Sequence, residues 1–194
     1  SFQAVPMHPD VEKLVEAGKI PKPVGERLSQ LAPGNFCFHK SFGAGKITSW
    51  DFGSKKITVD FENSRKQEMD LQFAIQKTEW LPEDDFRSVK IEQIGELKKL
   101  AKSDAVALVV HILQSHGGSI TGEAIEKLVS GAVIPAKEYK KWWDSTKKAV
   151  KESRKAVVPT KRTEAIVLRD SDITPAQGSM KMFEEAGVIV EYYD

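Results

Sequence analysis

Residues 36–74 read FCFHKSFGAGKITSWDFGSKKITVDFENSRKQEMDLQFA, and this stretch decides how the first half of the chain folds. Short runs in it alternate apolar and polar residues, as half-buried strands do, and polar or Gly-rich turns separate the runs. The pattern predicts strands at Phe36–Lys40, Lys46–Trp50, Lys56–Phe61, Glu68–Phe73 and Thr78–Leu81. Five short strands joined by tight turns close most simply into a small barrel of the SH3-like or Tudor-like kind.

After Pro82 the apolar residues recur at helical spacing. The stripe from Ile91 to Leu100 predicts a linker helix, and three later stripes predict three more helices, the second of which Thr121 caps. Two β-prone runs then follow, Ala156–Val158 and Ala165–Leu168. Three helices followed by a β-hairpin are the order of a winged helix.

The predicted fold class is therefore α+β, with a small SH3/Tudor-like β-barrel flanked by helices and then a winged-helix-like helical domain. A pair of short helices precedes the barrel, since apolar residues there also have helical spacing. The predicted parts are an N-terminal helical pair at 9–31, the barrel at 32–82, a winged-helix-like domain at 90–170 and a linker or tail at 171–194.

Composition narrows the class of protein. The apolar fraction is 40% and the formal charge is +1, so any attraction to nucleic acid has to come from a local patch. Cys37 is the only cysteine, which excludes an intrachain disulfide and a multi-cysteine zinc site and favours a buried core thiol. No long apolar run or signal-peptide pattern is present, so we expect a cytoplasmic protein without membrane contact.

No residue set has the arrangement that catalysis or metal binding needs. Gly43-Ala44-Gly45-Lys46 invites a phosphate-loop interpretation, but Lys40 and Ile47 stand where that motif needs Gly and Ser or Thr. A sharp bend of the barrel explains these glycines better. The four histidines are scattered, without the spacing of a metal-binding helix. We therefore expect a binding module with no catalytic residues, no cofactor and no metal.

The last predicted helix and the hairpin after it hold a local excess of lysine and arginine, in a chain whose formal net charge is only +1. Winged helices present these elements to DNA or RNA, so we predict phosphate contacts there. The predicted residues are Lys140, Lys141, Lys147, Lys148, Lys151, Arg154, Lys155, Lys161 and Arg162. The alternative is a solvated helix face, because Glu138, Asp144 and Glu152 dilute the charge. Trp142-Trp143 favours hydrophobic core over base stacking, since one ring must face inward.

An aromatic rim of the barrel is the candidate protein-docking site. If Ile47 and Ser49 face one side of their strand, Trp50 faces the other, beside a turn that carries Phe52. Aromatic side chains next to an available strand edge are a usual docking arrangement. The alternative is that Trp50 packs against the N-terminal helices.

Several short sequence motifs resemble a recurring family pattern. They are Pro33-Gly34, His39-Lys40, Phe42–Ile47, Trp50-Asp51, Val59–Glu62 and Met69–Ala74. The pattern is similar to Tudor-like domains that dock on bacterial RNA polymerase, those of CarD-type regulators and UvrD/PcrA helicases. It resembles most the N-terminal extension of long Gre-type transcription elongation factors. The stretch from Asp104 to Asp170 is similar to the winged-helix-like part of those extensions.

This resemblance implies a transcription elongation accessory module that docks on bacterial RNA polymerase. In the barrel relatives a strand edge pairs with the polymerase β subunit, which implies contact near Ile47–Phe52 and Lys55–Thr58. The implied protein-binding residues are Ile47, Trp50, Phe52, Lys55 and Lys56. The chain lacks the long charged hairpin of Gre factors, so we expect no assistance of RNA cleavage. The alternative is a DNA-binding transcriptional regulator that reads DNA with the winged helix and uses the barrel as scaffold or dimerisation unit.

Overall fold

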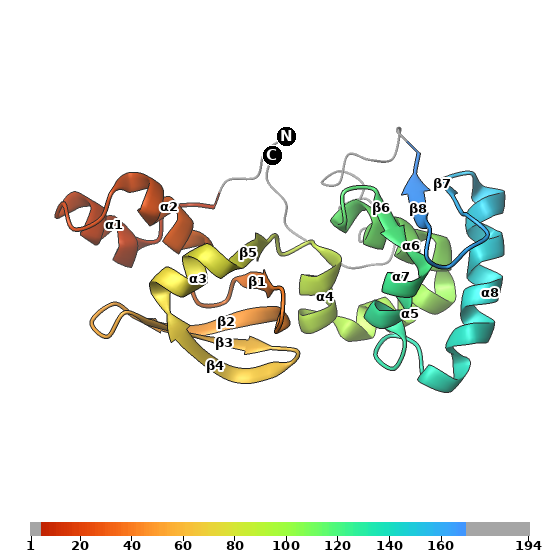
Figure 1. The fold of residues 1–194 in the computed structure, drawn as a ribbon, viewed down its shortest axis with the longest axis horizontal. Helices are drawn as coiled ribbons and strands as arrows, with labels where there is room; N and C mark the ends of the chain where they lie inside the picture. Colours follow the sequence, from red (N-terminus) through yellow and green to blue (C-terminus); the bar gives the residue numbers. More distant parts are fainter. Residues whose placement is uncertain (1–4, 170–194) are drawn as a thin grey trace. The chain divides into compact units, whose positions relative to one another are not determined.

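The computed structural model describes residues 5–169, and these divide into two compact units that meet in sequence between residues 83 and 84 (Figure 1). The described residues form eight helices, a five-stranded antiparallel sheet and a three-stranded antiparallel sheet. The predicted α+β class is therefore confirmed. The tail predicted at 171–194 lies outside the described residues. No helix within residues 5–169 has the length and apolar character needed to cross a membrane.

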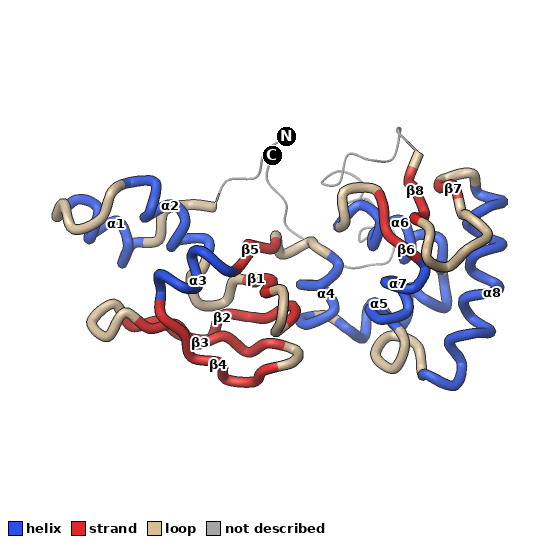
Figure 2. The backbone as a smooth tube through the Cα atoms, viewed as in Figure 1, coloured by secondary structure: helices blue, strands red, loops and turns tan. Residues whose placement is uncertain are grey.

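The first unit holds the five-stranded sheet and three helices (Figure 2). Its elements are α1 (Pro9–Glu16), α2 (Lys22–Gln30), β1 (Phe36–His39), β2 (Gly43–Asp51), β3 (Lys56–Phe61), β4 (Ser64–Asp70), α3 (Leu71–Lys77) and β5 (Thr78–Leu81). The strand order is β4-β3-β2-β1-β5, so β3, β2 and β1 are interior strands, with β2 in the centre, and β4 and β5 are the edges. The helix α3 connects the two edge strands along the chain.

The core of the first unit follows the predicted alternation most clearly in β3. Ile57, Val59 and Phe61 are buried there, and the residues between them are partly exposed. Cys37 is buried in the same core, and burial raises the pKa of its thiol to about 12. A thiol with that pKa stays protonated at neutral pH, so the cysteine acts as a core residue, as its flanking phenylalanines predicted.

The glycines of the rejected phosphate-loop motif lie at the start of β2. Gly43 has φ +83°, a conformation that L side chains rarely adopt. A Cβ atom on Gly45 would lie 2.6 Å from Cδ1 of Phe61. The first glycine therefore serves the bend into the strand, and the second makes room for a core ring.

The predicted strand Glu68–Phe73 is partly wrong. Its chain leaves the sheet at Asp70, and Leu71 begins α3. Leu71 and Ala74 are buried at helical spacing, whereas Phe73 is 39% exposed. A run of Leu, Phe, Ala and Ile satisfies either period, and packing of Leu71 and Ala74 onto the core selects the helix.

The second unit has the predicted winged-helix order and one additional strand. Its elements are α4 (Phe86–Glu92), α5 (Ile94–Ser103), α6 (Ala105–Ser115), β6 (Ser119–Thr121), α7 (Gly122–Val129), α8 (Ala136–Ser153), β7 (Ala156–Val157) and β8 (Ala165–Leu168). The strands pair in the order β6-β8-β7, so the unpredicted β6 joins the predicted hairpin. Thr121 caps α7 as predicted, because its Oγ1 accepts the N–H of Ala124 at 3.1 Å.

The predicted linker helix is instead two helices, α4 and α5, which are interrupted at Gln93. Phe86 from α4 and Leu97 from α5 are both fully buried in the core of the second unit. The unit therefore begins near Asp84, earlier than the predicted boundary at residue 90. The described residues reach 169, one short of its predicted end.

Candidate nucleic-acid interface and docking face

Helix α8 presents a lysine-rich face to solvent. Its 18 residues include six lysines and three acidic residues. Tyr139, Thr146 and Val150 bury the opposite face against the unit's core. Of the nine residues predicted to contact nucleic acid, eight are exposed and Lys147 is half-buried. The structure thus leaves the predicted set accessible.

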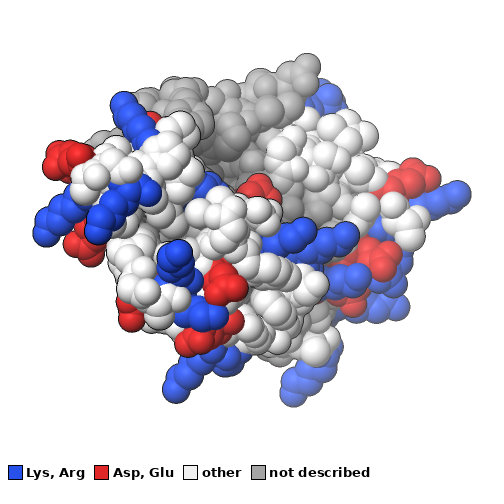
Figure 3. Space-filling view, turned by 60° about the vertical axis from the view of Figure 1, so that its left-hand side comes forward, with Lys and Arg blue, Asp and Glu red and all other residues white. Residues whose placement is uncertain are grey.

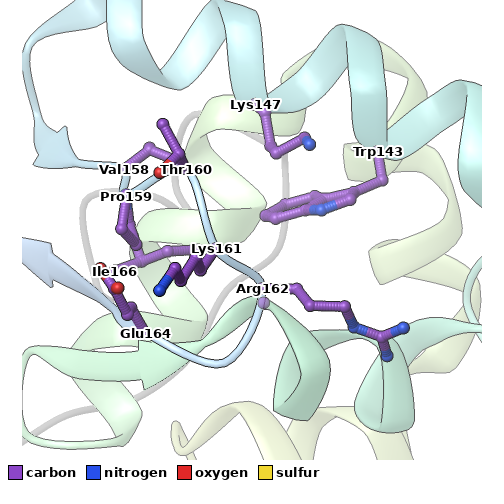
Figure 4. Close-up of a pocket in the computed structure, with 10 residues that line it drawn as sticks. Trp143, Lys147, Val158, Pro159, Thr160, Lys161, Arg162, Glu164 and Ile166 are labelled. Atoms are coloured by element: carbon purple, nitrogen blue, oxygen red, sulfur yellow. The ribbon is translucent and has the colours of Figure 1, made fainter.

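The loop of residues 158–164 between β7 and β8, called the wing below, packs beside α7 and α8. The N–H of Glu123 donates to the carbonyl oxygen of Arg162 at 3.1 Å, and the Arg162 guanidinium pairs with Glu126 at 3.4 Å. Figure 4 shows Trp143 and Lys147 reaching from α8 toward the wing. The wing therefore lies beside the side of α8 that carries Trp143 and Lys147.

This packing separates two pairs of lysines on α8. Lys140 and Lys147 lie seven residues apart, on the side that meets the wing. Lys141 and Lys148 are the next residues along the helix and are exposed to solvent. Arg154 has a left-handed conformation at the C-cap of α8, so the chain turns there from the helix toward the wing.

A cavity of about 340 Å³, called the wing pocket below, lies between α7, α8 and the wing. Its charged and aromatic lining residues are Glu126, Tyr139, Lys140, Trp143, Asp144, Lys147 and Arg162. Lys147 pairs with Asp144 at 3.8 Å, and its ammonium lies 6.0 Å from the Trp143 ring centroid. Figure 3 shows another face of the protein, on which basic and acidic side chains are also interspersed.

The two neighbouring tryptophans have different roles. The indole N–H of Trp142 donates to the carbonyl oxygen of Ala101 at 2.9 Å, which anchors this ring against α5. Trp142 is therefore the inward-facing ring that the sequence required. Trp143 also packs against the core but is half-buried and lines the wing pocket.

The predicted docking residues on β2 need correction. The side chain of Ile47 is 1% exposed, its N–H donates to Asn35 and its carbonyl accepts from Gly34. Because β2 is a central strand, neither the side chain nor the backbone of Ile47 is available to a partner. Trp50 packs edge-on against His8, the N-cap of α1, at 4.9 Å between ring centroids, which confirms the alternative that it contacts the N-terminal helical segment.

The other predicted docking residues lie at or near the β2–β3 turn. Phe52 is half-buried, 4.8 Å from Trp50 between ring centroids, and Lys55 is exposed. The ammonium of Lys56 pairs with the carboxylate of Asp70 at 2.7 Å. These residues form a mixed aromatic and basic corner, of which Phe52 and Lys55 remain accessible.

Sequence reasoning missed an apolar groove of about 640 Å³ next to this corner. Its apolar lining comes from α1, the α1–α2 loop, α2, the β2–β3 turn and α3, namely Leu14, Ile20, Val24, Leu28, Phe52, Leu71 and Ile75. These residues are spread over more than sixty positions of the chain, so no local pattern could have revealed the groove. Within residues 5–169 no cluster of His, Cys, Asp or Glu has the arrangement of a metal site.

Comparison with known proteins adds family context. Residues 87–173 match the GRAD helix-turn-helix domain. The chain is 26% identical over 146 residues to transcription elongation factor GreA of Chlamydia pneumoniae, which covers 74% of this chain and 20% of that protein. It is 27% identical over 134 residues to transcription elongation factor GreA of Chlamydia trachomatis serovar D, which covers 68% of this chain and 19% of that protein.

The chain thus spans about a fifth of the length of these curated relatives. No solved structure matches it significantly. The second unit of this chain accordingly contains a helix-turn-helix domain, and most of the chain is similar to a part of two GreA elongation factors.

Proposed function

We propose that this chain is a transcription elongation accessory module of Gre-type relatives, which contacts nucleic acid through α8 and the wing and docks on bacterial RNA polymerase through the first unit. The observation that carries the proposal is the exposed lysine face of α8 beside a basic wing, inside a helix-turn-helix domain. The similarity to proteins named transcription elongation factors supports the elongation context.

The second unit suits phosphate contact for a physical reason. The ammonium groups of Lys141 and Lys148 are exposed, and among the described residues neither has an ion-pair partner. Exposed cations release condensed counterions from nucleic acid when they bind its phosphates, which makes affinity fall with salt. A helix followed by a wing is also a recurrent way to present such cations to a duplex or strand.

For the first unit we propose a Tudor-like barrel that docks on the polymerase β subunit. Five short antiparallel strands in one sheet, with α3 between the last two, support that fold. Docking by strand addition needs a sheet edge, and β4 and β5 are the edges of this sheet. The accessible aromatic corner at Phe52 offers side-chain contact next to the apolar groove.

Reversing charge at Lys141 and Lys148 should weaken nucleic-acid binding. We expect the Lys141→Glu, Lys148→Glu double variant to bind a labelled oligonucleotide about tenfold or more weakly. The slope of log affinity against log salt should flatten by about two, since each lysine that contacts a phosphate contributes roughly one. Fluorescence anisotropy titrations at several salt concentrations measure both quantities.

The matched control for this change is Lys98→Glu with Lys102→Glu. These two lysines are exposed on α5 of the same unit, so the control changes net charge by the same amount. Equal weakening in both double variants would show only a global charge effect and would contradict contact through α8. Much tighter binding of one defined duplex sequence without polymerase would favour the alternative, a DNA-binding transcriptional regulator.

Docking predicts loss of polymerase when the aromatic corner is truncated. We expect Phe52→Ala with Lys55→Ala, the two accessible residues of the corner, to reduce recovery of purified bacterial RNA polymerase in a pull-down at least tenfold, because interface aromatics carry a large share of binding energy. Phe73→Ala, which removes an exposed aromatic elsewhere in the unit, should leave recovery unchanged. Thermal melts verify that the double variant is folded, and full recovery by it would contradict the proposed corner.

A further inference from the structure

We propose that the wing pocket binds an unpaired nucleobase, so that the second unit prefers single-stranded nucleic acid over a duplex. This inference rests on the proposed nucleic-acid contact and specifies its ligand class. The pocket of about 340 Å³ lies at the lower end of the range for small-ligand sites, which suits one base with its sugar.

The aromatic lining gives such a base a stacking surface. Trp143 is half-buried, and its ring lies nearly parallel to that of Tyr139, at 14° and 6.3 Å between centroids. Packing against Tyr139 and Trp142 holds the indole in place. A fixed aromatic ring next to cations is the arrangement that single-strand binders use, because every base has a face that can stack.

Tyr139 supplies an independent observation. Its side chain is 5% exposed, and its buried hydroxyl has no hydrogen-bond partner among the described residues. Burial and the nearby Glu126 carboxylate raise the pKa of this hydroxyl, so it remains a neutral donor. A buried hydroxyl without a partner is unfavourable. The ring nitrogens and carbonyl oxygens of a base are acceptors that would satisfy it.

The charges of the pocket fit a base with flanking phosphates. Three cations, Lys140, Lys147 and Arg162, face two carboxylates, Glu126 and Asp144. The cations can hold the phosphates on either side of the base, and the carboxylates can accept a hydrogen bond from a ring N–H, such as N3–H of thymine, or from an exocyclic amino group. Bases of a duplex are stacked inside it and cannot enter such a pocket, which gives the preference for unpaired bases.

Comparing the protein's affinity for a strand that has bases with its affinity for an abasic strand of equal length separates base stacking from phosphate attraction. We expect the protein to bind an oligothymidine of about eight nucleotides roughly tenfold more tightly than an abasic strand of the same length, and more tightly than a duplex of that length. Trp143→Leu should reduce affinity for the oligothymidine to the abasic level. Its affinity for the abasic strand should stay unchanged, because the lysines remain.

Two further variants keep the test decisive if Trp143→Leu disturbs folding. Tyr139→Phe keeps the ring and removes only the unpartnered hydroxyl, so it should fold normally and bind the oligothymidine several-fold more weakly. Trp143→Phe should retain part of the preference for bases. Equal affinity of the unmodified protein for the oligothymidine and the abasic strand would overturn this inference and leave the phosphate contact of α8 standing. Failure to bind any strand or duplex would overturn both.

Discussion

At pH 4 the free energy of unfolding of the second unit should be about 3 kcal/mol lower than at pH 7. The reason is a buried histidine that binds a proton much more readily in the unfolded chain than in the folded core. His111 lies on α6 and is fully buried. Its Nε2 is 2.7 Å from the carbonyl oxygen of Asp84, the residue at which the unit begins. Burial lowers the pKa of His111 from 6.5 to about 4, despite the opposing effects of the Asp84 carbonyl and Asp85.

The direction of this pH dependence follows from the two pKa values. In the unfolded chain His111 accepts a proton near pH 6.5, whereas in the folded unit it does so only near pH 4. Protonation therefore favours the unfolded state throughout this interval. The stabilisation is complete above about pH 6.5 and is lost as the pH falls toward 4, at roughly 1.4 kcal/mol per pH unit.

Urea unfolding at pH 7, 6, 5 and 4, followed by tryptophan fluorescence and circular dichroism, measures this effect. In His111→Gln the decrease in the free energy of unfolding between pH 6.5 and 4 should be about 3 kcal/mol smaller than in the unmodified protein, whatever the variant's stability at pH 7. His116→Gln is the matched control, since His116 is a half-buried histidine at the end of the same helix. An unchanged pH slope in His111→Gln would contradict the assignment.

Truncation of Phe61 should be the most damaging single change in the first unit. We expect Phe61→Ala to lower its free energy of unfolding by about 3–5 kcal/mol, because the change removes a large ring and leaves a cavity. Phe61 is fully buried on β3, with its ring centroid 5.3 Å from that of Phe42. A loss of this size is a large fraction of the stability of an ordinary domain.

Calorimetry can show whether the loss of stability in Phe61→Ala is confined to the first unit. The cores of the two units share no residue, so Phe61→Ala should lower one thermal transition and leave the other in place. Polymerase recovery should fall while oligonucleotide affinity persists. Phe73→Ala is the control, because its ring is 39% exposed and its loss should cost less than about 1 kcal/mol. A parallel fall of both transitions would contradict separate cores.

Local patterns were sufficient for much of this architecture. The alternation of Ile57, Val59 and Phe61 predicts β3 with the observed bounds, since a period of two is a property of neighbouring residues. Thr121 predicts the start of α7 because a cap bonds to N–H groups only a few residues away. The basic character of α8 and its wing is likewise visible without coordinates, as is the winged-helix order.

Other features depend on contacts between distant residues, and only the tertiary structure decided them. Leu71 starts a helix because the core selects one of two periods that its sequence allows. Ile47 lies on a central strand because β1 and β3 flank β2. Trp143 lines a pocket because Glu123 fixes the wing at Arg162, 39 residues away. The sequence by itself thus determined most of the elements and their charge. The choice of helix over strand at Leu71, the strand order, the edges and the pockets arose from long-range packing that no local pattern encodes.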